Sequence, residues 1–298
     1  FRTYSTMVMA QTPVMLLGLL MAWAWLRWRR EKKWGWALAI GAFAGWAAIT
    51  RPLDALGFAI PIGLAMAWEL RRGSRTAIAH TAIALLAGAV PFIELQVAFD
   101  WGVTGKPWKT PYVMYLEHNQ PGSVFGSGTA QMARSGSTLP QKQIYFGQLA
   151  ASESAWRKAG VASWAGLRLR MTASVALSCA ILLVLLPAGL LAAKERGRWV
   201  VLAPIPLYLL MYALNPFFLL HYAVPLTAAA AVCAVLGARA IEMGLNSPSH
   251  RRFAGTFLTT ALLLLAIGSL PQVNARITDE PYRTPLLDYT QAALAQIQ

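Results

Sequence analysis

Charged residues are scarce in this chain of 298 residues, and their scarcity excludes the commonest class of proteins. They make up 13% of the sequence, whereas soluble globular domains contain about one-quarter. Hydrophobic residues make up 57%, and mean hydropathy is +0.47. The sequence therefore predicts an all-α integral membrane protein with several bilayer-spanning helices, rather than a soluble enzyme or a disordered chain.

Cysteine is almost absent as well. Cys179 and Cys233 lie in apolar runs, far from a second thiol or a histidine at metal-ligand spacing, which argues against a disulfide framework and a zinc site. The motifs GxxxxGK(S/T), HExxH, Asp-x-Asp and GxSxG of common nucleotide-dependent and hydrolytic enzymes are also missing. No cofactor is predicted, and no residue pattern supports a divalent metal.

Apolar runs long enough to cross roughly 30 Å of hydrocarbon at 1.5 Å per residue occur eight times. They lie at residues 7–26, 35–50, 53–70, 76–97, 171–193, 199–214, 217–238 and 253–271. Two of them are short, so we expect tight helical hairpins that turn at Arg51-Pro52 and at Asn215-Pro216. The prediction is a multi-pass bundle of about eight spans, four in residues 1–97 and four in residues 171–271.

Lys and Arg, which give the chain a net charge of +14, cluster in one set of alternating connectors. Four connectors carry 5, 3, 3 and 3 basic residues, at 27–33, 71–75, 194–198 and 239–252. Because Lys and Arg mark cytoplasmic loops, this pattern predicts a protein of the cytoplasmic (inner) membrane with these connectors inside. It argues for topology and against a nucleic-acid partner. The segments 1–6, 51–53, 98–170, 215–216 and the tail 272–298 are then extracytoplasmic.

The segment 98–170 is the one long loop of this topology. Its first part is rich in Gly and Pro, which argues against a long helix there, and its interleaved aromatic residues suit the level of the lipid headgroups. After Pro140, apolar residues recur at intervals of three to five among basic residues that include Arg168. We expect this stretch to form an amphipathic helix on the outer surface of the membrane.

Polar residues at the ends of spans are the candidate functional residues, because a charge at membrane depth is costly and usually faces a cavity or a partner. Arg51 stands at the outer end of the second span, and its donor fork suits a phosphate. A structural pair with Asp54, or simple extension to the interface, is the alternative. For Glu94, an interfacial cap is favoured over a buried carboxylate, and His80 is interpreted as structural.

Further candidates come from the outer end of the seventh span and from the long loop. The imidazole of His221, beside Tyr222, can bind a phosphate or a hydroxyl, or it can serve as an ordinary helix-end histidine. Lys106, Tyr112 and Tyr115 combine a cation with aromatic rings, which suits an anionic lipid head and a sugar ring. Interfacial loops of membrane proteins in general contain such residues too.

Small residues at positions 41 and 45 predict close helix packing rather than a binding function. Gly41 and Gly45 have the small-xxx-small spacing that lets two helix backbones approach each other.

Three stretches resemble a known family. The run WGWALAIGAFAGWAAITRPLDALGFAIPIG (34–63) resembles the Gly-rich helix, Thr-Arg-Pro turn and Pro-containing helix of bacterial membrane glycosyltransferases of the GT-C superfamily. Residues 100–128 look like the extracytoplasmic loop of these proteins, and HYAVPLTAAA (221–230) is similar to one of their later helix starts. The likeness is to the dolichyl-phosphate-mannose or arabinose-transferase type.

The resemblance implies a polyprenyl-phosphate-linked sugar donor and transfer to an acceptor at the outer face of the membrane. In such proteins an acidic residue in the first outer loop acts as general base or as a metal-linked carboxylate. No acidic residue here matches it, so we expect that loop upstream of Phe1 and assign no catalytic residue. The candidate binding residues are Arg51 for the lipid phosphate, and Lys106, Tyr112, Tyr115, His221 and Tyr222 for the outer cavity. The alternatives are a transporter or flippase of lipid-linked sugars and a non-catalytic membrane scaffold. Membrane lipids are further expected partners, and the oligomeric state stays open.

Overall fold

The computed structural model describes ten parts of the chain. These are residues 10–119, 154–155, 158–160, 162–172, 180–192, 197, 199–213, 220–244, 255–256 and 259–260. The described residues form helices and turns, and none of them lies in a strand, which confirms the all-α prediction for this part of the chain. The chain divides into two compact units, Met9–Gly237 and a second unit made of Phe1–Val8 with Ala238–Gln298. The sites described below belong to the first unit.

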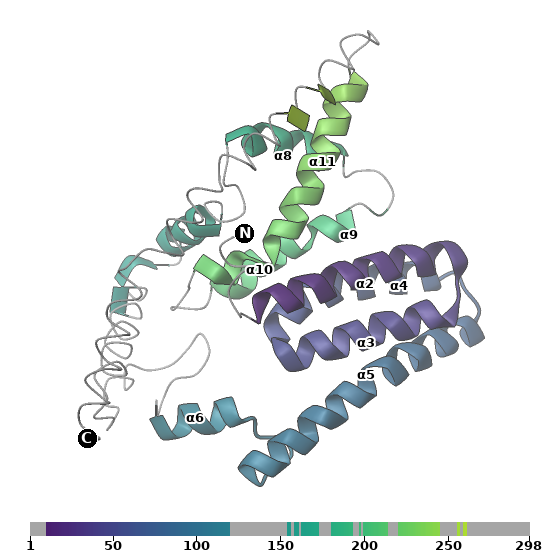
Figure 1. Ribbon diagram of the computed structural model, residues 1–298, viewed down its shortest axis with the longest axis vertical. Coiled ribbons are helices and arrows are strands. Elements are labelled where there is room, and N and C mark those ends of the chain that lie inside the picture. Colours follow the sequence, from purple (N-terminus) through teal and green to yellow (C-terminus); the bar gives the residue numbers. More distant parts are fainter. Residues whose placement is uncertain are drawn as a thin grey trace. The chain divides into compact units, whose positions relative to one another are not determined.

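Helices α2 to α6 follow one another along the chain with short connections (Figure 1). The bounds of the described helices are α2 Gln11–Glu31, α3 Trp34–Thr50, α4 Pro52–Leu70, α5 Arg75–Thr104, α6 Pro111–Asn119, α8 Ala180–Ala192, α9 Trp199–Leu202, α10 Pro204–Ala213, the 3-10 turn η2 Leu220–Ala223 and α11 Leu226–Gly244. Helical residues 162–172 lie between α6 and α8 in the sequence.

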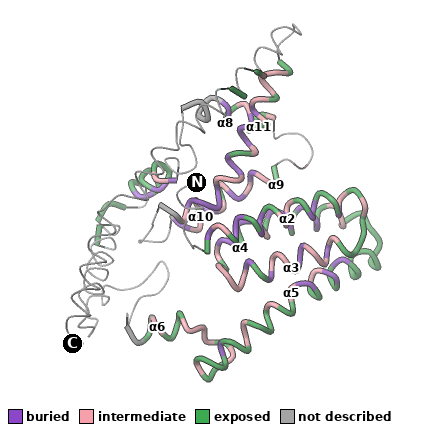
Figure 2. The backbone as a smooth tube through the Cα atoms, in the orientation of Figure 1, coloured by how far each residue is buried: buried purple, intermediate pink, exposed green. Residues whose placement is uncertain are grey.

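Three of the described helices, α4, α5 and α11, are long and apolar enough to cross a membrane. Large apolar side chains on these helices point outward rather than into a core: Leu64 is 61% exposed, Leu86 64% and Val235 54%. Helix α5 is exposed along most of its length (Figure 2). In water such surfaces would drive aggregation, whereas lipid tails solvate them. The chain is therefore a membrane protein.

Helix α3 packs most extensively against α5, and glycine makes the close approach possible. A Cβ atom at Gly41 would lie 2.0 Å from the backbone oxygen of Leu85, and one at Gly88 would lie 2.1 Å from that of Leu38. No larger residue fits at either position without moving a helix backbone. The packing role predicted for Gly41 is confirmed, and Trp46 of α3 stacks on Phe92 of α5 beside this contact.

The prediction that the long loop starts at residue 98 is wrong. Helix α5 continues to Thr104 and ends at Gly105, whose positive φ of 69° and N–H bond to Trp101 O close the last turn. Asp100 does not stop the helix because it is buried and accepts a hydrogen bond from Gln96 one turn earlier (2.7 Å). The predicted loop also contains a short helix, α6. It begins at Pro111, a residue that fits the first turn of a helix.

The other predicted boundaries agree in part. The spans 35–50 and 53–70 match α3 and α4 to within one residue. The stretch 199–214 is divided between α9 and α10, and the seventh span starts as η2 and then continues in α11 to Gly244, six residues beyond the predicted end. The expected turn at Asn215-Pro216, residues 7–9 of the first expected span and most of the expected span 253–271 lie outside the described residues.

Candidate functional site

Arg51 is the single residue between two antiparallel helices. Its N–H donates to Ala47 O (2.8 Å) and closes α3, while its carbonyl accepts from the N–H of Ala55 (3.0 Å) and opens α4. The following Pro52 restricts Arg51 to extended backbone, observed at φ −154° and ψ 93°, and itself occupies the first helical position of α4. The predicted Arg51-Pro52 turn is confirmed.

Asp54, in the first turn of α4, is the charged partner of Arg51. Its carboxylate is fully buried and accepts a bond of 2.5 Å from Arg51 Nε. The Tyr212 hydroxyl of α10 donates to the other carboxylate oxygen, and the Tyr208 hydroxyl donates to the Asp54 backbone carbonyl (3.2 Å). A carboxylate near a helix N-terminus is also favoured by the helix dipole. A buried negative charge is thus matched by a guanidinium and a hydroxyl.

Three tyrosine rings form a wall beside this ion pair. Tyr208, Tyr212 and Tyr222 stack in sequence, with centroid separations of 5.8 and 5.5 Å. The Arg51 guanidinium lies over the Tyr222 ring at 5.1 Å, and its Nη2 donates to the Tyr212 hydroxyl (3.2 Å). A Cβ at Gly57 would come within 2.4 Å of the Tyr208 ring, so this glycine lets α10 approach α4. We call Arg51, Asp54, Tyr208, Tyr212 and Tyr222 the arginine–tyrosine cluster.

A second guanidinium reaches the same wall from the helical residues 162–172. Arg168 is 3% exposed and lies over the ring of Trp164, 4.6 Å from its centroid. Burial lowers the pKa of Arg168 to about 10, because neighbouring protein replaces the water that stabilises the cation. Arg168, Tyr212 and Tyr222 line a small cavity of about 10 Å³, which is room for one water at most.

Residues 162–169 are helical, as predicted. Arg168, one of the basic residues of the expected amphipathic helix, is nevertheless buried, whereas Leu167 beside it is 44% exposed. The reason is that Trp164 and Arg168, four residues apart, share one side of the helix, and the aromatic ring shelters the cation.

The six predicted binding residues do not all meet in one place. Arg51 and Tyr222 join in the cluster, whereas Lys106 is exposed in the turn before α6, where its N–H donates to Thr104 Oγ1. Tyr115 is half-buried on α6. The backbone of His221 lies in η2 next to Tyr222, and its side chain is outside the described part.

Tyr112 stands near the cluster without belonging to its hydrogen bonds. Its side chain is 68% exposed overall. Desolvation of its hydroxyl and the neighbouring Tyr115 raise the pKa of Tyr112, and the Arg51 guanidinium acts in the opposite direction. Arg51 is therefore close enough for its charge to be felt at this residue.

Sequence reasoning missed Tyr208, Tyr212 and Arg168, and it left Asp54 only as a structural alternative. The spacing of Tyr208 and Tyr212 by four residues in an otherwise apolar helix is the signal that points to them, since both hydroxyls then face one partner. Among the described residues, no group of three His, Cys, Asp or Glu side chains lies close enough to hold a metal ion.

Comparison with known proteins adds no assignment. No protein-family model matches the chain, and no curated protein or solved structure matches it.

Proposed function

We propose that this chain acts as an integral membrane glycosyltransferase of the GT-C type, which moves a sugar from a polyprenyl-phosphate donor to an acceptor at the outer face of the cytoplasmic membrane. One observation carries the proposal. The Arg51 guanidinium is fixed by Asp54 through Nε and by Tyr212 through Nη2, and among the described residues its Nη1 group has no hydrogen-bond partner. A preorganised guanidinium with free donors suits the oxygens of a phosphate.

The position of Arg51 along the helices supports a site at a membrane surface. Helix α3 has 17 residues, so about 25 Å separates Arg51 from the basic connector 27–33. This distance is close to the thickness of the hydrocarbon core. We propose about eight membrane spans in all, which include the three candidate spans of the structure. The basic connectors then lie in the cytoplasm and Arg51 lies at the outer surface.

Charge balance in the cluster suits a departing phosphate. Arg51 and Arg168 bring two positive charges to the tyrosine wall, and Asp54 neutralises one of them. In sugar transfer the bond between the sugar C1 and the donor phosphate breaks, a bond from C1 to the acceptor oxygen forms, and the acceptor proton passes to a base. The excess cation stabilises the polyprenyl phosphate that leaves with the bonding electrons.

Asp54 is not the base of this reaction. Both of its carboxylate oxygens already accept hydrogen bonds, from Arg51 and from Tyr212, and the side chain is fully buried. A base must reach the acceptor hydroxyl directly or through one water. The base is a carboxylate outside the arginine–tyrosine cluster, as the family resemblance implies.

Binding of polyprenyl phosphate tests the proposal without requiring knowledge of the sugar. The full chain in detergent micelles should bind this lipid, and Arg51→Ala should weaken binding by more than about tenfold, roughly 1.5 to 3 kcal/mol. Arg51→Lys keeps a positive charge beside Asp54 but removes the donor fork, so it should fold and still bind poorly. Arg75→Ala removes a charge at the start of α5, outside the cluster, and should bind normally.

Two results would contradict the proposal. Unchanged polyprenyl-phosphate binding by a folded Arg51→Lys or Arg51→Ala variant would leave Arg51 with a structural role alone. Passage of an intact lipid-linked sugar across reconstituted vesicles, without release of polyprenyl phosphate, would identify a flippase instead.

A further inference from the structure

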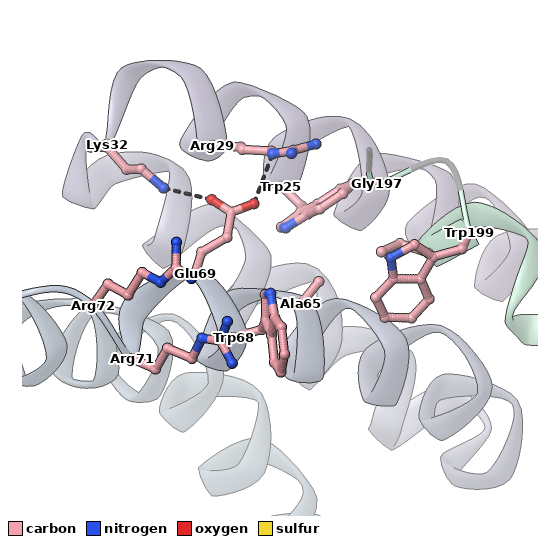
Figure 3. A pocket seen from close by; sticks show the side chains of 11 residues that line it. Trp25, Arg29, Lys32, Ala65, Trp68, Glu69, Arg71, Arg72, Gly197 and Trp199 are labelled. Carbon is pink, nitrogen blue, oxygen red and sulfur yellow. Dashed lines mark hydrogen bonds and ion pairs between the residues drawn. The ribbon is translucent and has the colours of Figure 1, made fainter. Parts of the chain in front are cut away.

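A pocket of about 570 Å³ lies at the other end of α2 and α4 from Arg51 (Figure 3). Helix α2 and the turn after it supply one wall, the C-terminal end of α4 another, and the start of α9 a third. The charged lining residues are Arg29, Lys32, Glu69, Arg71 and Arg72. We call this the basic pocket.

Positive charge exceeds negative charge by three among the described residues that line the basic pocket. Four cations there face one carboxylate, Glu69. Arg29 Nε and Lys32 Nζ both bind Glu69 at 2.7 Å, and Figure 3 shows the carboxylate between them. These two cations are held in place by the protein's own anion.

Arg71 and Arg72 are the cations that Glu69 does not hold. Both are exposed, and within the described part of the chain neither forms an ion pair. The Arg71 guanidinium lies 3.2 Å from the ring centroid of Trp68, which orients it as a flat donor surface beside the pocket. Two arginines without a counter-ion at one pocket are the arrangement that binds a phosphate.

The inner wall carries a further donor that the protein leaves unused. Trp25 is 1% exposed, and its indole N–H has no acceptor among the described residues. Figure 3 shows the indole nitrogen turned toward Glu69 and Trp68. A buried N–H without an acceptor costs free energy, and a ligand oxygen drawn into the pocket would supply one.

We propose that the basic pocket binds the phosphate of an anionic phospholipid headgroup. Free phosphate has the same chemistry, but two features favour a lipid. The pocket opens at the end of α4, a helix apolar enough to span the membrane, and Trp68 and Trp199 at its rim are 64% and 46% exposed. Exposed tryptophans at the end of a span sit at the headgroup level, where a lipid phosphate is already present.

This proposal is independent of the glycosyltransferase proposal, because the two sites share no residue and lie at opposite ends of α4. If the basic connectors are cytoplasmic, the ligand is an anionic lipid of the inner leaflet. A variant that loses lipid binding at the basic pocket should still bind polyprenyl phosphate at the arginine–tyrosine cluster, and the reverse should also hold. Each proposal can therefore be contradicted separately.

Native mass spectrometry of the full chain in detergent provides the test. Phosphatidylglycerol, phosphatidylcholine and inorganic phosphate are the three probes, each added separately. We expect phosphatidylglycerol to bind at least about tenfold more tightly than phosphatidylcholine, and Arg71→Gln with Arg72→Gln to abolish that preference. The matched control is Arg30→Gln with Arg75→Gln, which removes two exposed arginines near the same connectors that do not line the pocket.

The possible outcomes distinguish a phospholipid site from an effect of general surface charge and from a site for a soluble anion. Preference for phosphatidylglycerol that is lost in the Arg71, Arg72 variant and kept in the control supports the proposal. Equal loss in both variants would overturn it, because general surface charge would then be the cause. Binding of inorganic phosphate to the pocket without a preference between the two lipids would overturn the lipid assignment in favour of a soluble anion.

Discussion

The Tyr212 hydroxyl donates a hydrogen bond to the carboxylate of Asp54, a residue 158 positions earlier in the chain. This bond ties α10 to the first turn of α4 and places the Tyr212 hydroxyl beside the Arg51 guanidinium. The ion pair of two near neighbours in sequence thereby becomes part of a site built from distant segments. The geometry of Arg51 depends on a residue that local sequence does not reveal.

Tyr212→Phe should destabilise the protein by about 1 to 3 kcal/mol, since the buried Asp54 carboxylate loses a donor and nothing replaces it. The measurement is the midpoint of thermal unfolding in detergent, followed by tryptophan fluorescence. Tyr112→Phe is the matched control, because Tyr112 is 68% exposed and its hydroxyl makes no bond to Asp54. Equal midpoints for the two variants would show that the Tyr212 bond contributes nothing.

Arg51 and Asp54 should show strong coupling in a double-mutant cycle. Arg51→Gln leaves a buried carboxylate without its cation, and Asp54→Asn leaves a cation that is still 24% exposed, so the first change should cost more. The double variant should recover about 0.5 to 3 kcal/mol of the summed losses. Additive losses, measured by the same unfolding midpoints, would mean that the pair makes no net interaction.

Gly41→Ala should destabilise the α3–α5 contact by roughly 1 to 3 kcal/mol, because the new Cβ meets the Leu85 carbonyl and a backbone must move. Gly35→Ala on the same helix is the control. A Cβ at Gly35 meets nothing within 4 Å, and alanine favours a helix over glycine by roughly 0.5 to 1 kcal/mol. Opposite shifts of the unfolding midpoint are therefore expected, and shifts of the same sign would contradict the packing.

Glu31 should make stability depend on acidic pH. The Trp36 indole N–H and Lys33 bond its carboxylate, and the charges of Lys33 and Arg27 add to them, so the pKa of Glu31 lies below its ordinary value. A lowered carboxyl pKa gives stability that is present above the unfolded-state pKa and is lost as pH falls through the folded-state pKa. Glu31→Gln should flatten this part of the unfolding-versus-pH curve, and an unchanged curve would exclude the contribution.

Membrane topology can be checked with single cysteines in a chain whose Cys179 and Cys233 are replaced by alanine. A membrane-impermeant thiol reagent should label Lys106→Cys in intact cells and Gly73→Cys only after the membrane is opened. The reason is that 71–75 is one of the basic connectors expected inside, whereas residue 106 follows the opposite end of α5. The reverse labelling pattern would invert the proposed orientation.

Much of the helical architecture can be predicted from the sequence, because lipid leaves the chain few choices. A run of apolar residues in a bilayer must satisfy its backbone internally, so hydropathy alone predicts α3 and α4 almost to the residue. Pro52 also fixes the break at Arg51, since the residue before proline avoids the helical region. Hydropathy places the end of α5 too early, because Asp100 is polar. A hydrogen bond from Gln96 within the helix satisfies its carboxylate, and α5 continues past it.

The candidate site was only half predictable. Arg51 stands out in the sequence because a cation in an apolar stretch needs a partner, and Asp54 three residues later is an evident one. Tyr208, Tyr212 and Arg168 come from segments more than one hundred residues away, and the basic pocket likewise joins α2 and α4 to the start of α9. Sequence by itself determined most of the helical segments, α3 and α4 among them, and which charged residues interrupt the apolar runs. Which of those charges meet was decided by tertiary packing alone, because contacts between helices depend on side-chain shape at distant positions that no local pattern encodes.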